Sequence, residues 1–123
     1  MRSHLYNTLC EFRKHYGVHK PVYWHNDLEH SCNEHIKYMT YHKICQHAPK
    51  SMLDGAFECV ASMSYYNQHL IDKEAIDRLL YDNLLHSKEH TQLILKAHYI
   101  AASFGCIENG ENLEYYLCVR GYL

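Results

Sequence analysis

The sequence has no apolar run long enough to span a bilayer, and its six cysteines form no Cys-x-x-Cys pair. The first residues enter an amphipathic pattern without the apolar block of a signal peptide. We therefore expect a cytoplasmic protein, or a secreted one if a leader has been removed. The wide spread of the cysteines favours reduced, mostly buried thiols over a disulfide framework.

Neither sign of charge dominates, because 12 Lys and Arg residues face 14 Asp and Glu residues and the net charge is -2 with His neutral. This balance gives no general attraction to nucleic acid or to an anionic membrane surface. Apolar residues make up 47% of the chain and charged residues 21%, so a folded protein is expected. A length of 123 residues suits one domain, spanning 1–123, and is short for two.

Apolar residues at helical spacing predict four helices. The first ends near Gly17, and Arg13, Lys14 and His15 are expected to be solvated on its polar face. The second begins at Asn26, with Glu29 placed for a capping box. Asp72 is expected to cap the third, which runs to about residue 85, and Ser87 to cap the fourth.

Runs rich in apolar and β-branched residues predict strands over 57–63, 99–106 and 113–119, after a short extended connection at 21–24. The sequence Asn109-Gly110 is a strong hairpin signal between the last two strands. Their nearly continuous apolar character predicts a sheet that is covered on both faces.

Twelve histidines and twelve tyrosines are the unusual feature of the composition, and they make metal binding easy to imagine but hard to localise. His35 lies beside an apolar helical stripe and is expected to have an ordinary hydrogen-bond partner. His47 falls on a predicted loop, and His90 falls in the first turn of the fourth helix. Glu58 is a single charge in an apolar strand, so it needs a cation, a metal or several donors as partners.

Several short pieces, in this order, resemble the CAP superfamily of cysteine-rich secretory proteins, antigen 5 and pathogenesis-related 1 proteins. The segment 24–28 resembles the family's Leu-x-Trp-x-x-x-Leu, and 35–39 resembles its Ala-x-x-His-x-x-x-Met. Phe57-Glu58-Cys59-Val60-Ala61 resembles Gly-Glu-Asn-Ile-Ala, and Ser87-Lys88-Glu89-His90 resembles Ser-Pro-Gly-His. Phe57, Cys59 and Thr91 depart from the family pattern.

The resemblance implies an α+β fold, a three-layer α/β/α sandwich with a small antiparallel sheet between helices. It also implies a cleft in which His47 and His90 are metal ligands and Glu58 is the catalytic residue. Two imidazoles near one carboxylate can bind Zn²⁺ or another divalent ion in a labile site. If the domain is active, the expected chemistry is metal-assisted hydrolysis.

Three alternatives stay open on the sequence. His47, Glu58 and His90 could form only a structural hydrogen-bond network. The domain could be a non-enzymatic module that binds a protein, peptide or lipid, since tyrosines suit binding surfaces. A small zinc-stabilised structural domain is the third alternative.

Overall fold

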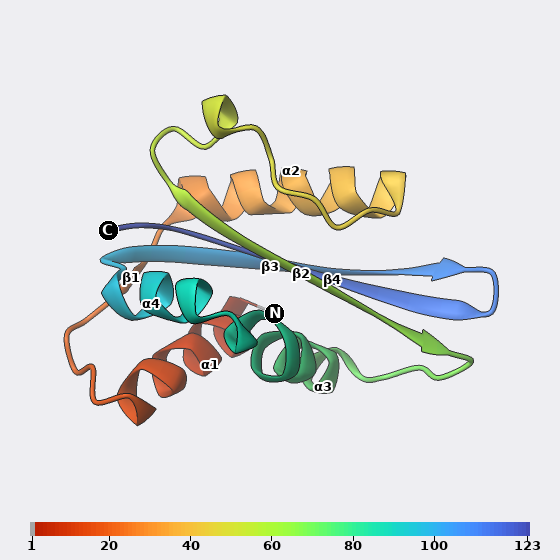
Figure 1. The fold of residues 1–123 in the computed structure, drawn as a ribbon, viewed down its shortest axis with the longest axis horizontal. Coiled ribbons are helices and arrows are strands. Elements are labelled where there is room, and N and C mark those ends of the chain that lie inside the picture. Colours follow the sequence, from red (N-terminus) through yellow and green to blue (C-terminus); the bar gives the residue numbers. More distant parts are fainter. Residues whose placement is uncertain (1) are drawn as a thin grey trace.

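A four-stranded sheet separates two layers of helices in the computed structural model, which describes residues 2–123 (Figure 1). The helices are α1 (Arg2–His15), α2 (Asn26–His42), α3 (Asp72–Asp77) and α4 (Lys88–Lys96). The strands are β1 (Tyr23–Trp24), β2 (Phe57–Tyr66), β3 (Tyr99–Asn109) and β4 (Asn112–Tyr122). Short helical segments of other types are η1 (Lys50–Met52), η2 (Arg78–Asn83) and η3 (Leu84–His86).

The strands follow the order β1-β3-β4-β2 across the sheet. The predicted hairpin is confirmed, because β3 and β4 pair antiparallel around Gly110, whose φ of 65° suits a residue without Cβ. The strand β2 pairs antiparallel with β4, from Phe57 opposite Gly121 to Tyr66 opposite Asn112. The two-residue strand β1 runs parallel to β3, which makes it the one departure from the predicted antiparallel sheet.

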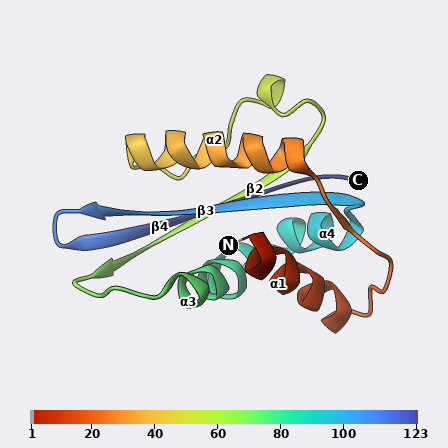
Figure 2. The same cartoon turned by 180° about the vertical axis from the view of Figure 1, so that it is seen from behind.

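The two faces of the sheet carry different helical layers, as expected of an α/β/α sandwich. The helices α1, α3 and α4 lie on one side of the sheet and α2 lies on the other (Figure 2). Successive strand residues point to opposite faces. In β4, Tyr115, Leu117 and Val119 belong to the larger core under α1, α3 and α4, whereas Tyr116 and Cys118 belong to the smaller core under α2.

The predicted start of the second helix at Asn26 is confirmed, but the predicted caps of α2 and α3 are wrong. The N-cap of α2 is His25, whose Nδ1 accepts the backbone N–H of Leu28, and Asn26 is already helical. Glu29 does not complete a capping box, because its carboxylate accepts the Trp24 indole N–H at 3.0 Å and pairs with Arg2. Asp72 is the first residue of α3 and provides no side-chain cap.

The third predicted helix is interrupted. The α-helical pattern of α3 stops at Asp77, a π-helical stretch follows in η2, and η3 turns with 3₁₀ geometry. The side-chain amide of Asn83 donates to the carbonyl of Ser62 on β2 at 3.0 Å. This bond lies where the π-helical stretch η2 gives way to the 3₁₀ turn η3. The cap at Ser87 is confirmed, since its Oγ accepts the backbone N–H of His90.

The prediction that Arg13 is solvated is wrong, because this residue is 2% exposed. Its guanidinium donates to the carbonyls of Ile94, Leu95 and Ala97 at the end of α4, and to that of Lys20. The last carbonyls of a helix lack intrahelical partners and attract positive charge, so this arginine of α1 caps α4. Burial lowers the pKa of the guanidinium.

Among residues 2–123, none of the helices combines the length and apolar character that a membrane crossing requires.

Candidate functional site

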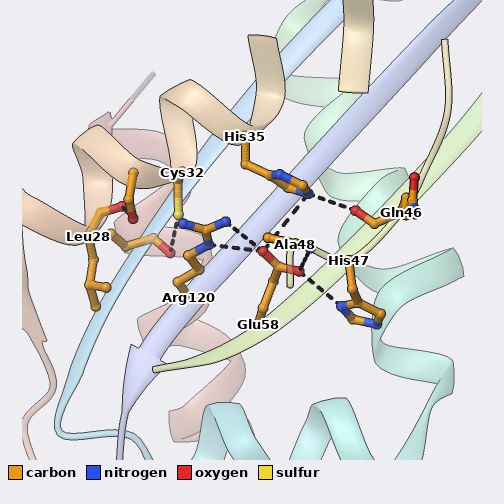
Figure 3. A network of polar contacts seen from close by, with 10 residues as sticks. Leu28, Cys32, His35, Gln46, His47, Ala48, Glu58 and Arg120 are labelled. Atoms are coloured by element: carbon orange, nitrogen blue, oxygen red, sulfur yellow. Dashed lines mark hydrogen bonds and ion pairs between the residues drawn. The ribbon is translucent and has the colours of Figure 1, made fainter. Parts of the chain in front are cut away.

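Glu58 lies on the α2 side of the sheet, near the start of β2, and its side chain is 1% exposed (Figure 3). Its partner is Arg120 of β4, which pairs with it in the strand register. The guanidinium donates from Nε and an Nη to Glu58 Oε2, at 3.0 and 2.7 Å. The buried negative charge of Glu58 is therefore compensated by the guanidinium of Arg120 on the neighbouring strand.

Arg120 stays positively charged in this setting. Burial by itself lowers the pKa of the guanidinium, but contact with Cys118 and the hydrogen bonds and charge of Glu58 outweigh burial. The pKa of Arg120 is consequently above its ordinary value. Charge-assisted bonds of this kind are about twice as strong as neutral ones, so the pair fixes the carboxylate orientation.

The second carboxylate oxygen of Glu58 holds the loop that follows α2. Oε1 accepts the backbone N–H of Ala48 at 2.9 Å and the Nδ1–H of His47 at 3.0 Å. Because a carboxylate only accepts, His47 carries its proton on Nδ1 when neutral. The His47 side chain is 60% exposed, and its Nε2 is left without a protein partner in the described part of the chain.

His35 supports the same loop from α2. Its Nε2 donates to the carbonyl of Gln46 at 2.7 Å and lies 3.9 Å from Glu58 Oε2. The expectation that His35 has an ordinary hydrogen-bond partner is confirmed. The residues His35, Glu58 and Arg120 thus form a buried polar cluster that anchors residues 46–48 (Figure 3).

His90 does not join this cluster. It sits in the first turn of α4, in the layer on the opposite face of the sheet from α2 (Figure 1). Its Nδ1 donates to the carbonyl of Leu84 in the preceding turn, at 3.0 Å. The structure therefore brings His47 to Glu58 but gives neither of them a hydrogen bond or ion pair with His90.

The three predicted residues do not fit a shared zinc site in this arrangement. Both oxygens of Glu58 already accept bonds, from four donors in all, and no three His, Cys, Asp or Glu side chains in residues 2–123 converge in a way that could hold a metal. Three surface hollows in this part of the chain are lined by other residues and not by His47, Glu58 or His90. No catalytic step through a metal follows from this geometry.

Sequence reasoning missed Arg120, the main partner of Glu58. The predicted last strand ended at residue 119, whereas β4 continues to Tyr122. A signal was present, because Arg120 is a single cation directly after the apolar run 115–119, just as Glu58 is a single anion in an apolar strand. Two isolated opposite charges on buried strands are candidates for pairing.

A group of aromatic rings lies beside the anchored loop, at the end of α2. The Tyr38 ring stacks on His35 with centroids 5.9 Å apart and contacts His42 at 4.4 Å, and His42 contacts Tyr41 at 5.0 Å. Tyr38 is 47% exposed and Tyr41 is 82% exposed. The residues Tyr38, Tyr41, His42 and Ile44 are together called the α2 aromatic face below.

The fold and its buried cluster define a three-layer α/β/α sandwich with an anchored loop over one sheet face. A solved structure with a similar fold is that of an outer surface protein from Borrelia burgdorferi, which is 12% identical in sequence. That alignment has a TM-score of 0.59 and covers 96% of this chain and 89% of that chain. BmVAL-1 is a looser match, with 18% identity, a TM-score of 0.46 and coverage of 81% and 58%.

At this level of identity the likeness to the Borrelia outer surface protein establishes the fold alone. No family model matches the sequence. No curated protein matches it either.

Proposed function

We propose that the chain is a divergent CAP-like domain that acts as a non-enzymatic binding module for a peptide or a peptide segment of a protein. The CAP assignment rests on the order of the short motifs and on the three-layer α+β sandwich. The α2 aromatic face is the binding surface. The observation that carries this choice is the row of contacting rings from His35 through Tyr38 and His42 to Tyr41.

The support for the surface is its combination of exposure and rigidity. Tyr38 and His42 stand four residues apart on α2, so each ring limits the rotation of the other. Tyrosines fixed in this way offer a large apolar area and a hydroxyl at low entropic cost on binding. The cluster around Glu58 holds the adjoining loop in place, so the surface is ordered before a ligand arrives.

A peptide suits this surface better than a nucleic acid or an anionic lipid. The net charge of -2 gives no long-range attraction to phosphate-rich partners. The face itself is formed by rings and one aliphatic side chain. Such surfaces recognise apolar or aromatic side chains that are presented by an extended or helical segment.

A random-peptide display library, selected on the wild-type protein, tests the proposal. Enriched peptides are synthesised and their affinities compared on the variants Tyr38→Ala and Tyr41→Ala. We expect at least a tenfold weakening in one of them, because truncating an interface tyrosine typically costs more than about 1.4 kcal/mol. Tyr66→Ala is the matched control, since Tyr66 is a 71% exposed tyrosine outside the α2 aromatic face, at the end of β2 away from Glu58.

Two outcomes would contradict the proposal. One is that no peptide is enriched above the background of the library. The other is that the enriched peptides bind Tyr38→Ala and Tyr41→Ala as tightly as they bind the wild type.

A second candidate is a labile divalent-metal site at His47, and one observation favours it. The Nδ1–H of His47 is bound to the Glu58 carboxylate, the arrangement that orients many metal-binding histidines and leaves Nε2 free. Calorimetric titration with zinc near neutral pH tests it. This candidate predicts binding that is lost in His47→Ala and kept in His90→Ala; unchanged binding in His47→Ala, or none in the wild type, would reject it.

A further inference from the structure

Two of the six cysteines meet in the smaller core. Cys32 of α2 and Cys118 of β4 are each 0% exposed and belong to the same buried cluster. Cys118 alternates with Tyr116 and Arg120 on the face of β4 that is turned to α2, and Cys32 points from α2 toward the sheet beside Arg120 (Figure 3). The two thiols are close enough for Cys32 to raise the pKa of Cys118.

The position of this cysteine pair suits a disulfide between α2 and β4. Both thiols lie in the same buried cluster between α2 and the sheet, where Cys32 is directed at the carbonyl of Ala101 at 3.8 Å. The other four cysteines lie elsewhere: Cys59 is buried in the larger core on the opposite face of the sheet, Cys10 is half-buried against that core, and Cys45 and Cys106 are exposed. All six thiols are free in the structure.

We propose that Cys32 and Cys118 form a buried disulfide when the protein folds in the presence of a disulfide oxidant such as oxidised glutathione. The bond joins α2 to β4, the strand next to the sheet edge. The α2 layer rests on the smaller of the two cores, so it is the layer that gains most from a covalent attachment. This inference does not depend on the peptide-binding function.

The chemistry takes two exchange steps. One protein thiolate attacks oxidised glutathione, which forms a protein–glutathione disulfide and releases one glutathione thiolate. The second protein thiolate attacks the protein sulfur of that bond, which forms the Cys32–Cys118 disulfide and releases the second glutathione. The protein loses two electrons and two protons, and one molecule of oxidised glutathione becomes two of the reduced form.

The timing of the reaction follows from burial. In the folded, reduced protein, the neighbouring Cys32 thiol and burial raise the pKa of Cys118, and they outweigh the opposite effect of Arg120. The reactive thiolate is therefore scarce in the folded state. The disulfide forms during folding, before α2 has packed on the sheet, and is then shielded from reductants by the same core.

The test uses the full chain with Cys10, Cys45 and Cys106 changed to Ser, which leaves Cys32, Cys118 and Cys59. Reduced, unfolded protein is refolded in a buffer of reduced and oxidised glutathione, and its peptides are mapped without reduction. We expect one linkage, between the peptides that contain Cys32 and Cys118. Cys59 serves as a decoy, because it is equally buried but lies in the other core.

The second readout is thermal stability. The disulfide closes a long loop, so the oxidised protein should melt about 5–15 °C higher than the reduced protein. The increase should be lost in Cys32→Ala and in Cys118→Ala and kept in Cys59→Ala. A map that shows Cys32 and Cys118 free, bound to glutathione or linked to Cys59 overturns the proposal, as does an equal melting temperature in both redox states.

Discussion

Arg120 binds Glu58 through two nitrogen donors on a single carboxylate oxygen, and this leaves the other oxygen to hold residues 47 and 48 of the loop. The pair joins β4 to the edge strand β2 and at the same time fastens the loop over that edge. Both carboxylate oxygens of Glu58 are therefore engaged in bonds that hold the fold together. A general base needs an available lone pair within reach of its substrate.

Truncation of either member of this pair should be costly. We expect Arg120→Met or Glu58→Met to lower the free energy of unfolding by about 3–5 kcal/mol, because each leaves the opposite charge buried without its partner. The double variant should lose less than the sum of the two single losses. Urea unfolding of the four proteins in a double-mutant cycle measures this coupling, and additive losses would show that the pair is not energetically linked.

The cap that Arg13 forms on α4 gives a second prediction. Arg13→Met should lower the free energy of unfolding by about 2–4 kcal/mol, because it leaves several carbonyls at the end of α4 without donors. Lys14→Met is the matched control, since Lys14 is exposed on the next position of α1. Equal loss in both variants in a urea titration would mean that the carbonyl contacts contribute nothing measurable.

Gly121 should not tolerate a side chain. A Cβ there would lie 2.5 Å from the Phe57 ring and 2.7 Å from the backbone oxygen of Tyr99, and the latter cannot withdraw without breaking the sheet. We expect Gly121→Ala to lower the free energy of unfolding by about 1–3 kcal/mol. Gly105→Ala, whose new methyl would meet only side-chain atoms of Ile36 and Thr40, should cost less when both variants are compared by urea unfolding, and equal losses would contradict the prediction.

Tyr116 should make stability depend on alkaline pH. Burial and the hydrogen bond to Glu114 raise the pKa of its phenol to about 12 from 10.0. The folded state thus favours the neutral phenol. Its contribution to stability is fully present below about pH 10 and is lost as the pH rises from about 10 to 12.

The urea midpoint of the wild type should accordingly fall more steeply over this pH interval than that of Tyr116→Phe. Absorbance of tyrosinate, followed on the same samples, should show one fewer late-titrating phenol in the variant. Parallel pH profiles for the two proteins would contradict the assignment.

The positions of the helices and the β3–β4 hairpin were predictable from the sequence because they follow local rules, whereas the layer order was expected only from the family resemblance. Periodic apolar residues place one face of each element against the core, and Asn109-Gly110 permits the tight turn. The cap at Ser87 was equally local. The predictions that proved wrong depended on other segments of the chain. The third helix is interrupted where the Asn83 amide donates to β2. Glu29 binds Trp24 and Arg2 and therefore does not cap its own helix.

The candidate site shows the same division. The sequence by itself determined that Glu58 required a partner, because an isolated carboxylate in an apolar strand is too costly to bury. Only the tertiary structure decided that the partner of Glu58 is Arg120 and that His47, not His90, also binds this carboxylate. Strand pairing makes Arg120 the neighbour of Glu58 across the sheet, and the two-residue alternation turns both side chains toward α2. The helix α4 packs on the other face of the sheet, so His90 at its start lies in the opposite layer from Glu58 (Figure 1).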